Sequence, residues 1–206
     1  MSRRLTPSSE RIYRAIKQQV LNGGFRPGER IDAVGLAEAM ASSLTPVRAA
    51  LQRLVGERLV EARPSEGFHR PPVTEVGLKA LYDWNGRVVL LAAQLAASEP
   101  EPARPADSPG GAEFAPTEAA RLFSGLARRT GNAACAETIA GLNDQLHAVR
   151  RLEADVLGDV DTELQALAVV LEGGALAAQR QAIIAYHRRR IGAAPALVNR
   201  LYRPPA

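Results

Sequence analysis

Two short amphipathic helices joined by a tight connector constrain the fold of this chain more than any other feature. The first is predicted over residues 33–41, where Asp32 is placed to cap its N-terminus. The second is predicted to begin near Thr45, and Pro46 then lies in its first turn, where a missing N–H costs little. With a connector of only three residues, 42–44, this pair is typical of a helix-turn-helix.

The flanking segments complete a winged version of this motif. Residues 9–22 carry apolar side chains at helical spacing, and a pair of glycines ends that helix. After the second helix of the pair, residues 59–62 and 68–71 are predicted as strands around a turn at 63–67. The first 71 residues are therefore predicted to form a winged helix-turn-helix domain.

The remaining residues, 72–206, read as a separate all-α domain, so the fold class is mostly α. Apolar periodicity and glycine breaks predict its helices. They cover residues 74–97, 117–129, 132–156, 161–172 and 175–191. Residues 98–116 are rich in Pro and Gly and are expected to form a loose loop, and the tail from 192 to 206 is expected to form at most a short turn.

Charge is distributed unevenly between these two parts. The chain has a net charge of +4 over 206 residues. Residues 1–71 hold 12 Lys/Arg against 7 Asp/Glu, whereas the rest holds 14 against 15. This asymmetry indicates a polyanionic partner for the first part, although a chance excess of solvated arginines would give the same balance.

Several functional classes are disfavoured by what the sequence lacks. No apolar run is long enough to cross a bilayer, and the basic N-terminus is not followed by the apolar stretch of a signal peptide. The single cysteine, Cys135, rules out an intrachain disulfide. No glycine-rich phosphate loop, nucleophile elbow or metal cluster is present. We therefore expect a cytoplasmic protein that is not an enzyme.

Candidate DNA contacts cluster where the second helix of the motif begins. That end of the helix would enter the major groove while flanking groups bind phosphates. Ser43 and Thr45 offer hydroxyls beside the first amides of the helix, and Arg48 lies one turn further along its exposed side. These residues predict contacts with double-stranded DNA, to bases or to phosphates.

Weaker candidates surround this set. Arg53 and Arg30 are further phosphate candidates. Gly67 belongs to the turn at the tip of the wing, which would bring His69 or Arg63 near the minor groove. A winged helix kept for packing or for protein contact alone is the alternative interpretation of the whole domain.

The first third of the chain resembles the GntR family of bacterial transcription regulators. The run Thr45-Pro46-Val47-Arg48 is its most specific feature. The other matching residues are Tyr13, Ile16, Val20, Gly23, Pro27, Gly28, Leu36, Ala37, Ala50, Leu51, Leu54, Leu59, Val60, Gly67 and Phe68. The resemblance implies a winged helix-turn-helix that binds DNA.

Four positions depart from the family pattern. Leu44 replaces an arginine, Ala49 an acidic residue, Arg58 a glycine before the wing, and Glu66 an arginine at the wing. Two positive contacts are thus missing, and Glu66 would repel phosphate if it faced the duplex. We expect a DNA site unlike the family's common one, or weaker affinity.

The helical remainder resembles the FCD domain of the FadR-type branch of that family. Matches run through Leu81-Tyr82, residues 91–96, residues 123–132 and residues 163–187. The resemblance implies a homodimer that reads a near-palindromic operator, and a sensor for a small organic acid, so that the protein would be a metabolite-responsive repressor. A dimer with a decayed sensor, acting constitutively or through a protein partner, is the alternative.

Many members of that branch hold a metal with one aspartate and three histidines. Here Ala120, Ser124 and Leu164 stand at three of those positions, and His187 alone remains. The resemblance therefore implies a lost metal site, and no cofactor is expected. For an effector bound without metal, the candidate polar contacts are Arg121, Arg128, Asn132, Arg150 and His187. Surface solvation or local pairing is the alternative role of each arginine.

Overall fold

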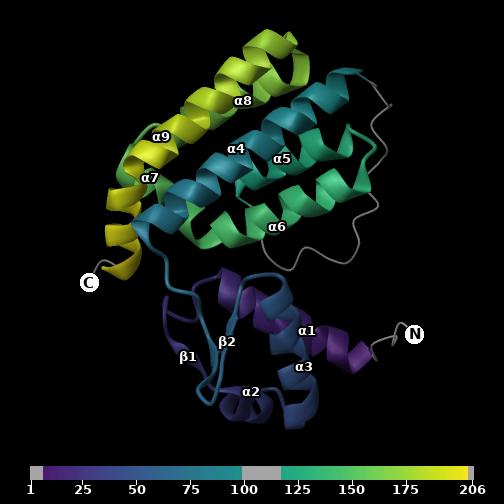
Figure 1. Ribbon diagram of the computed structural model, residues 1–206, viewed down its shortest axis with the longest axis vertical. Helices are drawn as coiled ribbons and strands as arrows, with labels where there is room; N and C mark the ends of the chain where they lie inside the picture. The colour runs from purple at the N-terminus through teal and green to yellow at the C-terminus, as the bar shows by residue number, and fades with distance from the viewer. Residues whose placement is uncertain (1–6, 99–116, 204–206) are drawn as a thin grey trace. The chain divides into compact units, whose positions relative to one another are not determined.

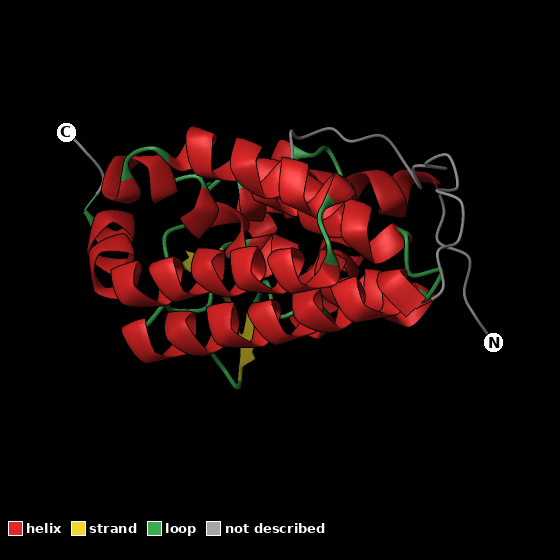
Figure 2. Cartoon of the chain, turned by 90° about the horizontal axis from the view of Figure 1, so that it is seen from above, coloured by secondary structure: helices red, strands yellow, loops and turns green. Residues whose placement is uncertain are grey.

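The computed structural model describes residues 7–98 and 117–203, and the chain divides into two compact units between Val73 and Thr74. The described residues are mainly helical, with one small antiparallel sheet (Figures 1 and 2). This confirms the predicted fold class of a winged helix followed by a helical domain. Of the loop predicted over 98–116, only Ser98 lies within the described residues, and it is helical.

The described part of the first unit contains the helices α1 (Pro7–Leu21), α2 (Ala33–Ala39) and α3 (Leu44–Gly56). The side chain of Asp32 caps α2 by accepting a hydrogen bond from the Val34 amide at 3.0 Å. Both α1 and α2 pack against α3, because each turns an apolar stripe toward it. The buried side chains of this core include Ile12, Ile16, Val20, Leu36, Val47, Leu51, Leu54 and Leu59.

A three-stranded sheet closes this unit. Its strands are β1 (Arg30–Ile31), β2 (Glu61–Arg63) and β3 (Gly67–His69), in the order β1-β3-β2 with antiparallel pairing. Strand β1 was not predicted, because two residues are too few to show the alternation of apolar and polar side chains that is typical of a strand. Its partner strand, β3, also lies far along the chain. The strand predicted at 59–62 begins later, because the amides of residues 59 and 60 both bond back to the Leu54 carbonyl of α3.

The second unit is a bundle around α4 (Glu75–Ser98), which packs against α5 (Glu118–Arg128), α6 (Ala133–Arg150) and α9 (Leu176–Tyr202) (Figure 1). Two further helices are α7 (Glu153–Leu157) and α8 (Val160–Gly173). The described core is built mainly from aliphatic side chains, with Phe123 and Tyr186 at its centre. Among the described helices, none has the length and apolar character of a membrane span.

The ends of two predicted helices are wrong. The helix predicted over 132–156 ends at Arg150, and the chain turns before α7, where Glu153 is buried in ion pairs with another helix. The helix predicted to end at Ile191 continues to Tyr202 with Pro195 inside it. Burial of Ala194 and Leu197 stabilises this extension. This tertiary packing could not be predicted from the local sequence.

The apolar side chains assigned to α4 divide between two faces. Leu78, Tyr82, Val89 and Ala92 recur at helical spacing and are buried, together with Asn85. By contrast, Trp84 is 54% exposed, Leu91 50% and Val76 78%. The sequence of α4 therefore contains two overlapping stripes of apolar side chains, and only one of these stripes packs into the core of the bundle.

Candidate nucleic-acid interface

The N-terminus of α3 is exposed to solvent, and its polar side chains are available for contacts with another molecule. Ser43 occupies the N-cap position with extended backbone, yet its side chain makes no capping hydrogen bond. Thr45 is exposed and lies two residues before the buried Val47. Because the Ser43 side chain does not cap the first amides of α3, these N–H groups remain available as hydrogen-bond donors to an anionic group.

Arg48 is the exposed cation on this part of α3. Within residues 7–98 and 117–203, its guanidinium has no ion pair or hydrogen bond. An arginine without an internal partner keeps its five donors for phosphate oxygens or for a guanine edge. The structure thus brings together Ser43, Thr45 and Arg48, as the sequence predicted they would lie.

Arg53, by contrast, makes contacts with other residues of the first unit. Its guanidinium lies 3.5 Å from the centroid of the Tyr13 ring and bonds to Glu10 Oε2 at 2.9 Å. Glu57 lies 3.5 Å from the same group and also accepts hydrogen bonds from Tyr13 and Lys17. These contacts tie α1 to α3, so the structure gives Arg53 a packing role and does not support its prediction as a phosphate contact.

The wing presents an acidic tip. Gly67 adopts a φ of 89°, which explains the glycine after the turn, and Glu66 beside it is 64% exposed in its side chain. His69 is 6% exposed, with Nδ1 unpartnered and Nε2 4.0 Å from Glu66. The buried imidazole offers little surface for a minor-groove contact, and a DNA contact by His69 stays a prediction.

Arg30 is the cation available at the wing. It is exposed on β1 opposite His69, and its Nε lies 4.0 Å from where a Cβ on Gly67 would be. Sequence reasoning gave no role to Arg70, which is buried and donates to the Leu59 carbonyl at 2.8 Å. Burial lowers the pKa of Arg70, and its contact braces the base of the wing.

The candidate effector residues separate into two groups. Arg121 pairs with Glu118 on the surface, Arg128 is exposed, and Asn132 caps α6 by accepting from the Cys135 amide at 3.0 Å. Arg150 and His187, however, are both buried and meet at one atom, Asn85 Oδ1, at 3.0 Å and 2.9 Å. The structure therefore brings together only these two of the five.

Sequence reasoning missed the two asparagines of this buried cluster as contact residues. Asn85 and Asn143 are 0% and 5% exposed and lie on the apolar stripes of α4 and α6. A polar residue on the apolar stripe of a predicted helix is the signal that would have found them.

The positions at which the family resemblance implies metal ligands hold other residues in this chain. Ala120, Ser124 and Leu164 are not metal ligands, and residues 7–98 and 117–203 contain no group of three or more His, Cys, Asp or Glu side chains suited to a metal. The Asn143 amide instead donates to the Ala120 carbonyl at 3.2 Å and to Ser124 Oγ at 3.1 Å. A donor occupying the place of metal ligands does not fit a cation there.

Comparison with known proteins identifies the first unit. Residues 8–69 match the family model described as "Bacterial regulatory proteins, gntR family". These residues form a GntR-family helix-turn-helix domain. The match covers α1 to β3 and includes the α3 N-terminus described above, so the resemblance stated from the sequence is confirmed for this domain.

Two curated relatives share this part of the chain. The uncharacterized HTH-type transcriptional regulator YdhC of Bacillus subtilis (strain 168) is 31% identical over 94 residues, which are 46% of this chain and 42% of the relative. The HTH-type transcriptional regulator McbR of Escherichia coli (strain K12) is 39% identical over 70 residues, 34% of this chain and 30% of the relative. The chain thus matches less than half the length of these relatives.

Solved structures extend the likeness to both units. E. coli McbR/YncC superposes with a TM-score of 0.66 at 17% identity, covering 97% of this chain and 100% of the other. A GntR regulator from Rhodococcus sp. RHA1, described as putative, gives a TM-score of 0.69 at 20% identity, covering 94% and 99%. At such low identity these matches show a shared fold, including the C-terminal helical unit.

Proposed function

We propose that this protein is a DNA-binding transcription regulator of the GntR type. The observation that carries the proposal is the N-terminus of α3, where Ser43 leaves the helix uncapped and Arg48 has no internal partner among the described residues. The excess of positive charge in the first unit, 12 Lys/Arg against 7 Asp/Glu in residues 1–71, supports binding to a polyanion. All three curated relatives are named as HTH-type transcriptional regulators or repressors.

The proposal includes a symmetric dimer that reads a near-palindromic operator. Trp84 and Leu91, both about half exposed, lie seven residues apart on one face of α4, which leaves an apolar surface for a second copy. In such a dimer two copies of α3 would reach major grooves about one DNA turn apart.

Repression controlled by a metabolite is the further part of the proposal. A decayed sensor would have a core closed by apolar side chains, whereas here Arg150, Asn85, Asn143 and His187 converge on one another inside the bundle. A core that keeps several buried polar groups together favours a sensor that still binds a ligand. The relative GlaR of Escherichia coli is named as a transcriptional repressor.

Footprinting on the DNA upstream of the protein's own gene tests the DNA-binding proposal. Arg48→Ala should weaken binding there by about fivefold to a hundredfold, which corresponds to ~1–3 kcal/mol for an arginine contact. Arg58→Ala is the matched control, because it removes an exposed arginine at the opposite end of α3 and should leave affinity unchanged. No protection at moderate salt, together with an Arg48→Ala protein that behaves like wild type, would contradict the proposal.

A further inference from the structure

Gln52 is an exposed residue of α3 whose side chain has no partner among residues 7–98 and 117–203. Its two neighbours in the chain differ from it. Leu51 is buried in the core of the first unit, and the Arg53 guanidinium bonds to Glu10 Oε2 at 2.9 Å. The Gln52 carboxamide therefore keeps two N–H donors and one carbonyl acceptor for another molecule.

Gln52 lies on the same face of α3 as the candidate DNA contacts Thr45 and Arg48. Exposed residues follow one another on this face at the intervals i, i+3, i+4 and i+7, namely Thr45, Arg48, Ala49 and Gln52. The other face packs against α1 and α2, and its side chains are buried. The same intervals are used by helices that lie in the major groove and present side chains from two successive turns to the bases.

The exposed face of α3 carries no negative charge. None of the 13 residues of α3 is acidic, because Ala49 stands where the GntR pattern has an acid. The arginine of that pattern at the start of the helix is also replaced, by the partly buried Leu44. Two side chains of this face can therefore distinguish a base by a pair of hydrogen bonds, and they are Arg48 and Gln52.

We propose that Gln52 is a specificity-determining residue that reads an adenine in the major groove of the operator. Its Nε2 would donate to adenine N7, while its Oε1 would accept from the adenine N6 amino group. The Ala49 methyl group would contact the C5-methyl group of a thymine beside it. This inference rests on the proposed DNA binding and names part of the base sequence that the protein selects.

The geometry of α3 sets where this adenine should lie. Gln52 follows Arg48 by four residues, which is about 6 Å along the helix axis. Base pairs are stacked ~3.4 Å apart in B-DNA. The A·T pair read by Gln52 should therefore lie about two base pairs from the nucleotide that Arg48 contacts, once in each half-site of the operator.

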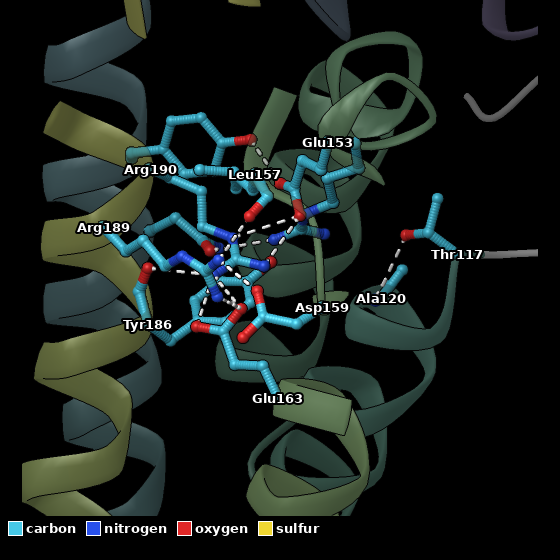
Figure 3. A network of polar contacts seen from close by, with 12 residues as sticks. Thr117, Ala120, Glu153, Leu157, Asp159, Glu163, Tyr186, Arg189 and Arg190 are labelled. Atoms are coloured by element: carbon cyan, nitrogen blue, oxygen red, sulfur yellow. Dashed lines mark hydrogen bonds and ion pairs between the residues drawn. The ribbon is translucent and has the colours of Figure 1, made fainter. Parts of the chain in front are cut away.

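Substitution of Gln52 tests binding without removing an internal contact. Arginines of α9 show the opposite condition, since Arg190 bonds to Glu153 at 2.9 Å and to Glu163 at 2.7 Å, and Arg189 bonds to Glu163 at 3.0 Å (Figure 3). Changing such a residue would disturb the fold. Because Gln52 is exposed and has no such partner among the described residues, its variants should keep the Tm of wild type.

The experiment is selection of binding sites from a pool of random-sequence duplex DNA by the full-length protein. Wild type should enrich adenine at one position of each half-site. Gln52→Ala should lower the preference for adenine there by about fivefold to a hundredfold, the value of one bidentate base contact. Gln52→Glu should change the preferred base from adenine to cytosine, because a carboxylate accepts from cytosine N4 and cannot donate to adenine N7.

Gln19→Glu is the matched control, because it places the same charge at an exposed glutamine of α1. It should leave the preferred bases unchanged, even where the added charge weakens binding to all sequences. Modified DNA tests the contact from the other side. Replacing the selected adenine by 7-deazaadenine, which lacks N7, should weaken binding of wild type but not of Gln52→Ala. Equal weakening of both proteins would contradict the proposed contact.

Failure of this inference differs from failure of the proposed function. If wild type enriches no sequence, DNA-specific binding fails and the role of Gln52 fails with it. If wild type enriches a site that depends on Arg48, while both Gln52 variants select the same bases as wild type, DNA binding stands and the inference is wrong. Weaker binding to every sequence without a change of preferred base would indicate a phosphate contact or a packing role, and would also overturn it.

Discussion

Arg58 has a backbone conformation that side chains rarely adopt. Its φ is 60°, directly after the C-cap of α3, and its amide and the next one bond back to the Val55 and Leu54 carbonyls. This is the position where helices commonly end on glycine, since a Cβ costs about 1 kcal/mol or more there. The sequence comparison with the GntR pattern marked this residue as a departure, and the structure shows that the departure strains the backbone.

Arg58→Gly should therefore stabilise the protein. We expect the free energy of unfolding to rise by up to about 1 kcal/mol, because glycine adopts positive φ without the steric cost of a Cβ. Thermal or denaturant unfolding of the full chain measures this change. Arg58→Ala removes the same long side chain but keeps the Cβ, so it should give no gain; an equal gain in both variants would show that the side chain, not the backbone, is responsible.

At the scale of elements, a glycine sets how closely α4 approaches α9. A Cβ on Gly86 would lie 3.0 Å from His187 Cγ and 3.3 Å from His187 Cβ, which is closer than two such atoms normally pack. The absence of a side chain at this position thus lets the His187 ring reach the adjacent residue, Asn85. Sequence alone shows a glycine inside a helix, which ordinarily only weakens it.

Gly86→Ala should accordingly destabilise the bundle despite its better helix propensity. The clash should cost about 1–3 kcal/mol and so exceed the gain of up to about 1 kcal/mol from alanine. Gly141→Ala on α6 is the matched control, since nothing lies within 4 Å of its added Cβ, and it should be neutral or stabilising. Equal shifts in the unfolding midpoint for both variants would contradict a close approach at Gly86.

Element boundaries show where local pattern stops being sufficient. The existence of α1, α3 and α4 follows from apolar spacing that can be read directly, and the Asp32 cap follows from residue type. The break before α7 does not, because it depends on Glu153 reaching Arg190, which is 37 residues away. Strand β1 likewise exists only through its pairing with β3.

At the scale of the whole molecule, the exposed face of α4 is where we expect self-association. Its apolar residues Trp84 and Leu91 are flanked by an ion pair between Asp83 and Arg87 at 2.8 Å. Large apolar side chains that remain about half exposed on one helix face are typical of a surface that another molecule covers.

Trp84→Glu should convert the dimer to a monomer, because the new charge would be buried without a partner at the interface. Analytical ultracentrifugation measures the change, and affinity for DNA carrying two half-sites should fall with it. Val169→Glu places the same charge at a 71% exposed apolar residue of α8 and should leave the dimer intact. A Trp84→Glu protein that sediments as wild type does would exclude this face as the interface.

The sequence by itself determined the order of elements in the first unit, its GntR-type pattern and the exposed set Ser43, Thr45 and Arg48. These follow from short-range physics, namely helical periodicity, capping and turn chemistry, which neighbouring residues settle among themselves.

Only the tertiary structure decided which charged groups are available and which are paired. Arg48 and Arg53 look alike in the sequence, yet Arg53 is held by Tyr13 and Glu10 while Arg48 is not. In the same way Arg150 and Arg190 both enter the bundle core, but Arg190 alone meets carboxylates. Ion pairing depends on residues that are tens of positions apart in the chain and come into contact only when the bundle folds. The local sequence around each arginine therefore does not predict its partner.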